Sequence, residues 1–493
     1  MSFKADKQVQ QQFFTYASLV LIFLLICRLI ANYFIPLFDT TEARYGEIAR
    51  KMLETGNWVT LQQDYGIPFW AKPPLSTWLS AFFMHLLGVN EFAARLPGLL
   101  LSIGILWLVW GLAKKHSGSM VALFSLLVLA GTLYFFIDAG TVMTDPALIF
   151  CTTLASVSFW HAMVYDNKLW SYIFFIGLGL GLLAKGPIAV MFVGMTVFFW
   201  VLLRNEWANL WRRLPWIKGT ILVLAIAAPW YILAEIRTPG FLNYFILGEH
   251  LQRFLTPGWT GDKYGIAHHA PKGMIWLYAI AGVFPWNIVA GRWFLKHGKR
   301  LPALCQDEDG WLSYLLLWAI VPLFFFTFAS NIIYPYVFPA LPAFALLFSE
   351  IWHRSNEKLD NLNWVLISSL LCGVLFLAGA FILKVKPEIV PNTQKPIIST
   401  WFKQHPASGS NLIYWDYKTD FSAEFYSKGK VKSVKNIEGL CQLLSNHLEN
   451  YLVIDSNETG QIPKNLFEKF TPVKTFRVHS KTMLLLHSPV LAC

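Results

Sequence analysis

Long apolar runs recur along most of this chain, and they limit its fold more than any other feature of the sequence. Each run approaches the ~20 residues that an α-helix needs to cross a lipid bilayer, so the pattern predicts about eleven membrane-spanning helices. An all-α polytopic membrane protein is therefore expected. The runs lie at about residues 13–33, 96–113, 118–138, 146–165, 170–184, 186–203, 217–236, 273–291, 311–328, 332–350 and 362–384.

Composition agrees with a bilayer environment. Hydrophobic residues make up 55% of the 493 residues and charged residues only 14%, whereas soluble proteins carry about 25% charged residues. The net charge of +11 does not predict a nucleic-acid partner, because Lys and Arg cluster in short loops between the apolar runs. These clusters follow the even-numbered runs, which places them and the N-terminus in the cytoplasm by the positive-inside rule. The clusters are Lys114–Lys115, Lys168, Arg204 to Lys218, Arg292 to Arg300, and Arg354 to Lys358.

Three long segments then fall on the opposite, outer face, at about residues 36–95, 235–272 and 385–493. Segments of this length exceed simple connections and commonly carry function. We expect residues 1–384 to form the membrane domain and residues 385–493 to form a small α/β domain outside the membrane. Within 385–493, NLIYWDY and YLVID predict buried strands, NIEGLCQLLSNHL predicts an amphipathic helix and KTFRVHSKTMLLLHS predicts a strand pair. Cys441 and Cys493 could form a disulfide there.

The first outer segment begins with two acids at the end of the first apolar run. Asp39 and Glu42 could bind a metal, orient a hydroxyl group or stabilise a positively charged sugar carbon. Their spacing also fits a capping box, with Asp39 as the N-cap of the following helix and Glu42 three residues into it. Both interpretations stay open.

Lys72 precedes Pro73 and Pro74, which fix the backbone and favour the start of a helix. A cation beside a helix N-terminus suits a phosphate ligand. The alternative is an interfacial lysine that reaches toward the headgroups.

Asp145 follows the third apolar run and precedes Pro146. An acid near membrane depth is costly, so it predicts function. The alternative is an N-cap before Pro146.

Further polar and aromatic side chains fall near the same membrane face. Together they predict a site for a phosphate-bearing lipid beside an acid-lined sugar pocket, although each one alone is typical of interfacial packing. They are Arg44, Tyr45, Lys185, His250, Arg253, His269, Tyr334 and Tyr336.

The order of motifs resembles the membrane glycosyltransferases of the GT-C class. The segments DTTEARYGEIARKMLETGNWVT, AKPPLSTWLSAFFMHLLG, RLPGLL, LLAKGPIAV and YVFPALP are similar to those of the aminoarabinose transferases that modify lipid A, which are related to protein O-mannosyltransferases. The resemblance covers roughly residues 10–350. It implies a GT-C fold of about 11–13 transmembrane helices, a polyprenyl-phosphate-linked sugar donor and an active site on the outer face.

The resemblance also implies roles for particular residues, with three departures from the family pattern. Asp145 matches an acid of the second outer loop, and Lys72 matches the lysine before the proline pair. Thr41 stands where the family has its first acid, so either Asp39 or Glu42 takes that role. Ala71 stands where many members have Glu, so any divalent metal site that uses this acid lacks one ligand here. Asn331 stands where a lysine is frequent.

The resemblance implies an inverting glycosyltransferase of the bacterial inner membrane that acts on lipid A or another envelope glycan. Lys72, Lys185, Arg253 and Arg44 would bind the donor phosphate, and Asp145 with Asp39 or Glu42 would be catalytic. Tyr45, His250, His269, Tyr334 and Tyr336 would line the substrate pocket. A monomer is expected, with a periplasmic C-terminal domain and with membrane lipids as further partners.

Three other functions fit a chain with these spans. A transporter or lipid flippase also has many spans, but it places ionisable residues near the bilayer midplane and often shows paired halves. A scaffold for polysaccharide assembly needs no site of this kind. A protein O-glycosyltransferase differs only in its acceptor.

Overall fold

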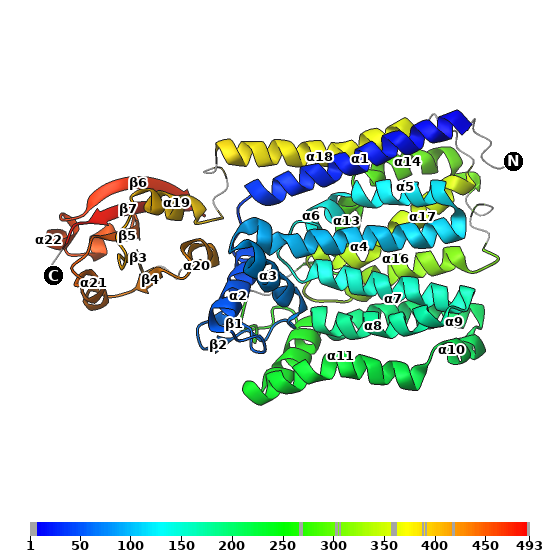
Figure 1. The fold of residues 1–493 in the computed structure, drawn as a ribbon, viewed down its shortest axis with the longest axis horizontal. Coiled ribbons are helices and arrows are strands. Elements are labelled where there is room, and N and C mark those ends of the chain that lie inside the picture. Colours follow the sequence, from blue (N-terminus) through cyan, green and yellow to red (C-terminus); the bar gives the residue numbers. More distant parts are fainter. Residues whose placement is uncertain are drawn as a thin grey trace.

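The computed structural model describes residues 7–265, 270–300, 304, 307–355, 362–386, 389, 392–416 and 420–490. A bundle of long helices fills one side of the molecule, and a small domain with a β-sheet projects from one end of the bundle (Figure 1). Among the described residues, eight helices are long and apolar enough to cross a membrane, or nine if one bent pair counts as a single span. The predicted polytopic helical fold with a C-terminal α/β domain is confirmed. The predicted count of about eleven spans is not reached among the described residues, because apolar helices such as Ser119–Ala130 and Trp311–Thr327 are shorter than a full span.

Every predicted apolar run forms helix. Most runs form one continuous helix, and the break expected between residues 184 and 186 is present because Gly186 adopts a φ of +84° between two helices. The continuous helices are α1 (Lys7–Phe34), α4 (Glu91–Ser117), α7 (Asp145–Tyr165), α8 (Lys168–Lys185), α9 (Pro187–Arg204), α11 (Trp216–Arg237), α16 (Trp311–Thr327) and α18 (Leu362–Val385).

Three runs depart from simple spans. The run at 118–138 divides into α5 (Ser119–Ala130) and α6 (Leu133–Asp138), and the run at 332–350 begins with the 3₁₀ helix η3 (Tyr334–Ala340) before α17 (Leu341–Arg354). The run at 273–291 forms α13 (Met274–Gly282) and α14 (Trp286–His297), which meet at 94°. Proline lies at or near two of these breaks, at Pro285 and Pro339, where the missing backbone N–H interrupts the helical hydrogen bonds.

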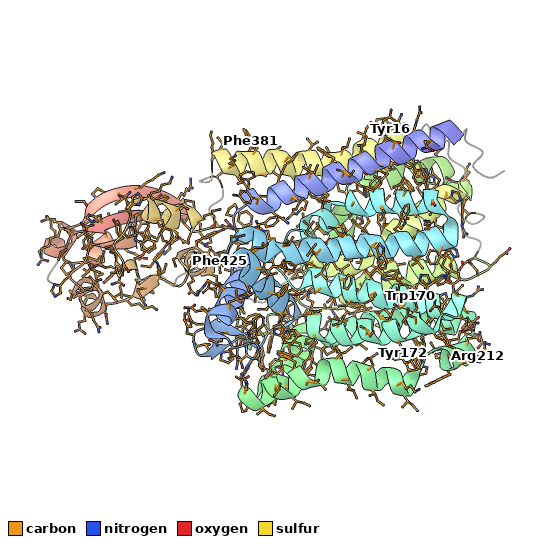
Figure 2. The ribbon with its side chains drawn as sticks, in the orientation of Figure 1. Tyr16, Trp170, Tyr172, Arg212, Phe381 and Phe425 are labelled. Atoms are coloured by element: carbon orange, nitrogen blue, oxygen red, sulfur yellow. The ribbon has the colours of Figure 1, made fainter. Side chains whose placement is uncertain are left out.

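The two ends of the bundle differ in character. The first outer segment forms α2 (Thr41–Thr55), the short strands β1 (Gln62–Asp64) and β2 (Ile67–Pro68), and α3 (Leu75–Leu87). The second forms the π-helix η1 (Asn243–Gln252) and α12 (Arg253–Leu255). These elements lie at the end that carries the C-terminal domain, whereas the short basic helix α10 (Trp207–Arg213) lies at the opposite end, as the positions of Phe425 and Arg212 show (Figures 1 and 2). We refer to these as the outer end and the basic end.

The C-terminal domain is built on a mixed five-stranded sheet with the order β4-β3-β5-β7-β6. The central strand β5 pairs in parallel with β3 and antiparallel with β7. Strand β4 was not predicted, because VKSV carries little of the apolar signal of a strand. The elements are α19 (Lys395–Lys403), β3 (Leu412–Trp415), α20 (Phe421–Ser427), β4 (Val431–Val434), α21 (Ile437–Leu444), β5 (Asn450–Asp455), η6 (Thr459–Gln461), α22 (Lys464–Phe467), β6 (Thr471–Val478) and β7 (Lys481–Ser488).

Apolar side chains cover both faces of this sheet. Trp401 and Tyr414 belong to the core on one face, and Leu440 and Leu452 belong to the core on the other. Burial on both faces explains why β3 and β5 read as continuous apolar runs. Cys441 is disulfide-bonded, and its predicted partner Cys493 lies outside the described residues.

Helix α20 docks this domain against α2 and the residues that precede it. Lys51 Nζ lies 2.7 Å from Glu424 Oε2, and the hydroxyl of Tyr426 accepts a hydrogen bond of 2.7 Å from the backbone N–H of Leu37. Gly46 lets Leu37 pack closely on α2, since a Cβ there would lie 2.9 Å from Leu37 Cδ1, and the Phe425 ring of α20 would lie 3.5 Å from the same position. Polar contacts and close packing thus hold the domain against the first outer segment.

Candidate active site

A small cavity at the outer end brings together side chains from both outer segments. Its volume is about 110 Å³. Three cations, one acid and a wall of apolar side chains enclose it, which is the composition expected for a phosphate attached to a hydrocarbon. The lining residues are Lys72, Lys185, Ile188, Met191, Glu249, His250, Arg253, Phe254, Phe325, Phe326, Asn331 and Tyr336.

Asp145 and Lys185 stand at the meeting ends of two neighbouring helices. Asp145 is the first residue of α7 and Lys185 is the last residue of α8, and Lys185 Nζ lies 2.6 Å from Asp145 Oδ1. The Asp145 residue is only 2% exposed. The alternative prediction of an N-cap is wrong, because Thr144 precedes α7 and no side chain caps the helix.

Lys72 belongs to a cluster of charges built around a buried acid. Its Nζ lies 2.5 Å from Glu249 Oε1, and Arg253 Nη1 lies 2.8 Å from the same oxygen. Pro74 directly precedes α3, so Lys72 stands just before a helix, as predicted. The second outer segment thereby supplies the acid and one of its two cations.

Burial raises the pKa of Glu249, but Lys72 and Arg253 outweigh burial and the net pKa is lowered. Glu249 is therefore a carboxylate that holds two cations beside the cavity. Its Oε2 is buried and makes no hydrogen bond within the described ranges, so it retains capacity for another donor. Sequence reasoning missed Glu249. The signal in the sequence was its spacing of four residues from Arg253, which is typical of an ion pair along one face of a helix.

His250 and Tyr336 both line the cavity, as predicted. Burial lowers the pKa of His250, and its Nδ1 lies 2.7 Å from the carbonyl oxygen of Phe245 while its Nε2 lies 3.3 Å from that of Lys185. Burial thus favours the neutral ring, which can donate a hydrogen bond to only one of these two carbonyl oxygens. The ring lies against Gly186, at the break between α8 and α9. Tyr336 stacks on Phe326 with ring centroids 4.0 Å apart.

Asn331 contributes differently from the lysine that the family pattern would place there. Its Nδ2 donates a hydrogen bond of 2.6 Å to the carbonyl oxygen of Arg253. It thereby holds the backbone of Arg253 and adds no positive charge to the cavity.

The two first-loop acids face different parts of the molecule. Glu42 Oε2 lies 2.7 Å from Arg95 Nη2, and its Oε1 accepts a hydrogen bond of 3.3 Å from the backbone N–H of Val142, in the loop that leads to Asp145. Asp39 Oδ1 instead accepts a hydrogen bond of 2.9 Å from the backbone N–H of Ser422, in the C-terminal domain.

The prediction of a capping box over these acids is wrong. Residue Thr40 precedes α2, and no side chain caps the helix. Burial raises the pKa of Asp39 to about 7, with repulsion from Asp420 as the next cause, against the lowering effect of the Ser422 hydrogen bonds. Asp39 is thus a contact between domains, whereas Glu42 is tied to the loop of Asp145.

Three other predicted residues pack near the cavity without lining it. Arg44 lies over the Phe69 ring at 5.5 Å and donates to the backbone carbonyl of Tyr264. Tyr45 packs edge-on against the same Phe69 ring at 5.9 Å. Tyr334 packs against Tyr134 at 5.3 Å. His269 lies outside the described residues.

The described part of the chain contains no group of three or more His, Cys, Asp or Glu side chains that could hold a metal ion. Ala71, where many family members have Glu, supplies no ligand. The structure therefore assigns no ligands to the divalent metal that the resemblance left open.

Comparison with known proteins agrees with this architecture. Residues 13–245 match the family described as dolichyl-phosphate-mannose-protein mannosyltransferase. The chain is 27% identical over 395 residues to undecaprenyl phosphate-alpha-4-amino-4-deoxy-L-arabinose arabinosyl transferase 1 of Pseudomonas fluorescens, covering 75% of this chain and 64% of that protein. It is 29% identical over 343 residues to the corresponding transferase of Yersinia pestis, covering 67% of this chain and 58% of that protein. The matched stretches thus span less than two thirds of those relatives.

The crystal structure of ArnT from Cupriavidus metallidurans bound to undecaprenyl phosphate has the same fold. Its TM-score is 0.75 at 18% sequence identity, over 96% of this chain and 98% of that one. The predicted resemblance to this group of GT-C membrane proteins is confirmed.

Proposed function

We propose that this chain, a multi-pass membrane protein that matches the protein mannosyltransferase family over residues 13–245 and shares the ArnT fold, is a glycosyltransferase of the bacterial inner membrane. It would transfer a sugar from undecaprenyl phosphate to lipid A. In this proposal the N-terminus is cytoplasmic, residues 1–384 form the catalytic membrane domain and residues 385–493 form a periplasmic domain. One chain supplies the whole cavity, so the proposed unit is a monomer.

The observation that carries the proposal is the convergence of Lys72, Lys185 and Arg253 on one cavity with an apolar wall. A phosphate diester joined to a polyprenyl chain needs both features, because its charge requires cations and its hydrocarbon requires an apolar path. Met191 lies on that wall and is 41% exposed. The hydrocarbon would therefore leave the cavity along α9 into the bilayer.

Donor binding would rearrange the charges of the cavity. Lys72 and Arg253 already face Glu249 at 2.5 Å and 2.8 Å, and Lys185 already faces Asp145 at 2.6 Å. The acids therefore hold the cations in position before the substrate arrives. A bound phosphate would then share these cations with the acids. Positioned charges of this kind stabilise a leaving group without reorganisation during the reaction.

The transfer reaction follows from this placement. An acceptor oxygen forms a bond to the anomeric carbon of the donor sugar while the bond from that carbon to the phosphate oxygen breaks. The electron pair remains on undecaprenyl phosphate, where Lys72, Lys185 and Arg253 stabilise the charge. Attack opposite the leaving group inverts the anomeric configuration.

Asp145 would act on the other side of the sugar. A lipid A phosphate is already a nucleophile, so Asp145 and Glu42 would orient the acceptor and stabilise positive charge at the anomeric carbon. A hydroxyl acceptor would instead transfer its proton to Asp145. The family match makes a protein hydroxyl the second candidate acceptor.

Purified protein in nanodiscs, supplied with undecaprenyl-phosphate-linked aminoarabinose and lipid A, provides the test. Mass spectrometry should show lipid A heavier by one sugar and free undecaprenyl phosphate in equal amount. Transfer to an added serine- and threonine-rich peptide in place of lipid A would support the second acceptor. Donor movement across liposomes without any transfer would instead support a flippase and contradict the proposal.

A further inference from the structure

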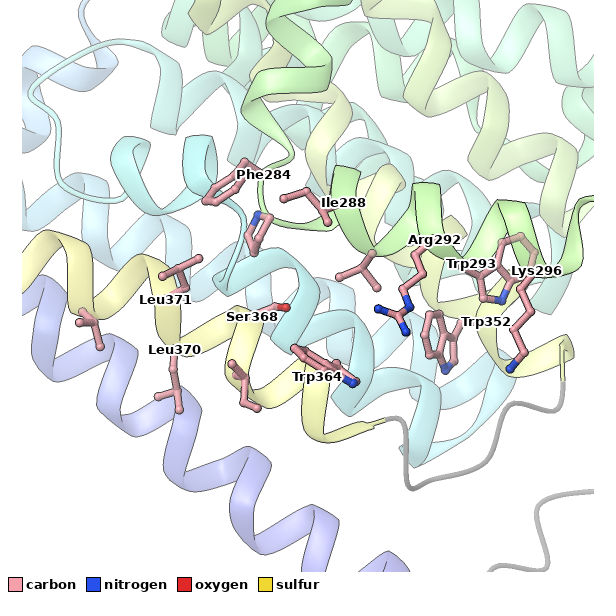
Figure 3. Close-up of a pocket in the computed structure, with 14 residues that line it drawn as sticks. Phe284, Ile288, Arg292, Trp293, Lys296, Trp352, Trp364, Ser368, Leu370 and Leu371 are labelled. Atoms are coloured by element: carbon pink, nitrogen blue, oxygen red, sulfur yellow. The ribbon is translucent and has the colours of Figure 1, made fainter.

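A second, larger cavity lies at the basic end of the bundle, away from the candidate active site. It has a volume of about 720 Å³ and lies between α14 and α18, with the end of α17 beside it (Figure 3). It shares no lining residue with the cavity at the outer end. The proposed transfer reaction therefore leaves it without a role.

The walls of this cavity are apolar and open sideways. Ile288 of α14 and Ile367 of α18 both line it, and they are 64% and 56% exposed. In a membrane-spanning bundle, residues with this exposure face lipid hydrocarbon. The space between them is therefore continuous with the bilayer and suits an acyl chain.

Two cations stand at the rim of this cavity. Arg292 and Lys296 are one helical turn apart on α14, and both are exposed. Their side chains extend to the side where Trp352 and Trp364 lie (Figure 3). Trp364 is 60% exposed, and tryptophan in such positions is typical of the level of the lipid headgroups. The cations are thus at headgroup level and the apolar walls run away from them into the bilayer.

We propose that this cavity binds an anionic phospholipid of the leaflet at the basic end. Its phosphate contacts Arg292 and Lys296, and one acyl chain fills the space between α14 and α18. The chemistry recognised is a phosphate ester on hydrocarbon, which undecaprenyl phosphate shares. A phospholipid fits this site better, because the basic end faces the leaflet whose anionic lipids attract such cations. The cations of the candidate active site, by contrast, lie at the outer end.

Native mass spectrometry of the intact protein tests this site. The protein is equilibrated in nanodiscs that contain phosphatidylglycerol or phosphatidylcholine, and the lipid retained after release is counted. Wild type should retain phosphatidylglycerol in preference to phosphatidylcholine. The double variant Arg292→Ala with Lys296→Ala should lower that retention by roughly 30-fold, since each of the two cations near the headgroups contributes about 1 kcal/mol.

A second double variant, Arg212→Ala with Lys218→Ala, is the matched control. It removes the same charge from two exposed positions at the basic end that do not line the cavity, so it should leave retention unchanged. If both double variants lost the same amount of phosphatidylglycerol, the general positive charge of the surface would explain the retention, and the proposal would be overturned. Equal retention of the two lipids by wild type would also overturn it.

The apolar half of the site needs its own variant. Ser368 lines the cavity on α18 (Figure 3), so Ser368→Phe should displace the acyl chain and lower retention by a similar factor. Ala378→Phe places the same ring on an exposed position of α18 outside the lining set and should have no effect. If undecaprenyl phosphate displaces phosphatidylglycerol at equal concentration, the site belongs to the carrier lipid and the phospholipid proposal is wrong.

Discussion

Lys185 Nζ lies 2.6 Å from Oδ1 of Asp145, where the end of α8 meets the start of α7 at the outer end of the bundle. Asp145 has only 3% of its side chain exposed, so this pair has little access to water. An ion pair held at the edge of a cavity can separate when a phosphate arrives and attracts the lysine. The carboxylate is then available for the sugar or the acceptor.

The first prediction concerns Asp145 itself. Asp145→Asn should lower sugar transfer by roughly 100-fold or more, the size typical of a lost catalytic acid or base, while the amount of folded protein changes little. The assay is the rate of lipid A modification by purified protein. Asp166→Asn, at the other end of α7 and exposed, is the control. Near-normal turnover by Asp145→Asn would remove this residue from the mechanism.

The second prediction concerns the leaving phosphate. Lys72→Ala should lower transfer by roughly 100-fold, as expected when one stabilising donor is removed, and Lys72→Arg should retain more activity because it keeps the charge. Glu249 keeps its contact with Arg253 at 2.8 Å, so the cluster should stay folded.

Initial rates and donor binding measure this effect. Lys263→Ala is the matched control, because Lys263 lies over the Trp70 ring at 4.3 Å in the same outer region and does not line the cavity. Equal and mild effects of Lys72→Ala and Lys72→Arg would argue that Lys72 only reaches toward the headgroups.

The third prediction separates the two first-loop acids. Glu42→Gln should lose most transfer, because Glu42 is tied to the loop of Asp145 through the Val142 N–H. Asp39→Ser should keep transfer but weaken the attachment of the C-terminal domain, because Asp39 contacts Ser422.

Two measurements distinguish these effects. Transfer rates report on Glu42, and limited proteolysis between the domains reports on Asp39. Ser422→Ala removes the hydroxyl that donates to Asp39 Oδ2 but keeps the backbone N–H that donates to Oδ1. It should therefore show the proteolysis pattern of Asp39→Ser in weaker form, and combining the two should add little, since both changes act on one contact. Loss of transfer in Asp39→Ser with intact docking would assign the catalytic role to Asp39.

The sequence predicted the elements whose signals are local. Each apolar run identified helical structure, although three runs divide into two helices, and the positions of the basic clusters identified one end of the bundle. Lys72, Lys185 and Arg253 were predicted to share a phosphate site, and they do line one cavity. Their positions beside recognisable breaks in the apolar pattern made this possible.

Contacts between distant segments could not be predicted in this way. Glu249 lies 177 positions from Lys72, and Ser422 lies 383 positions from Asp39, so no periodicity links either pair. The capping box over Asp39 and Glu42 failed for the same reason. Asp39 binds Ser422 and Glu42 binds Arg95, and both partners are distant in the sequence. The spacing of the two acids predicts only whether they can bind the first N–H groups of the nearby helix.

The last prediction follows from the raised pKa of Asp39. Burial raises this pKa to about 7 from an ordinary value of 3.8, so the folded state binds the proton more tightly than the unfolded state. Ionisation therefore costs folding free energy as pH rises from about 4 to 7, and the whole cost is present above pH 7. Asp39→Asn cannot ionise. Its thermal midpoint should therefore exceed that of wild type by more at pH 8 than at pH 5.

Thermal unfolding followed by tryptophan fluorescence in one detergent, at several pH values from 5 to 8, measures this difference. Some pH dependence should remain in Asp39→Asn, because burial also raises the pKa of Glu47 to about 7. Glu468→Gln, which removes an exposed acid of the C-terminal domain, should follow wild type at every pH. A difference between Asp39→Asn and wild type that stays constant from pH 5 to 8 would show that Asp39 is ionised throughout. The Ser422 hydrogen bonds would then outweigh burial in setting its pKa.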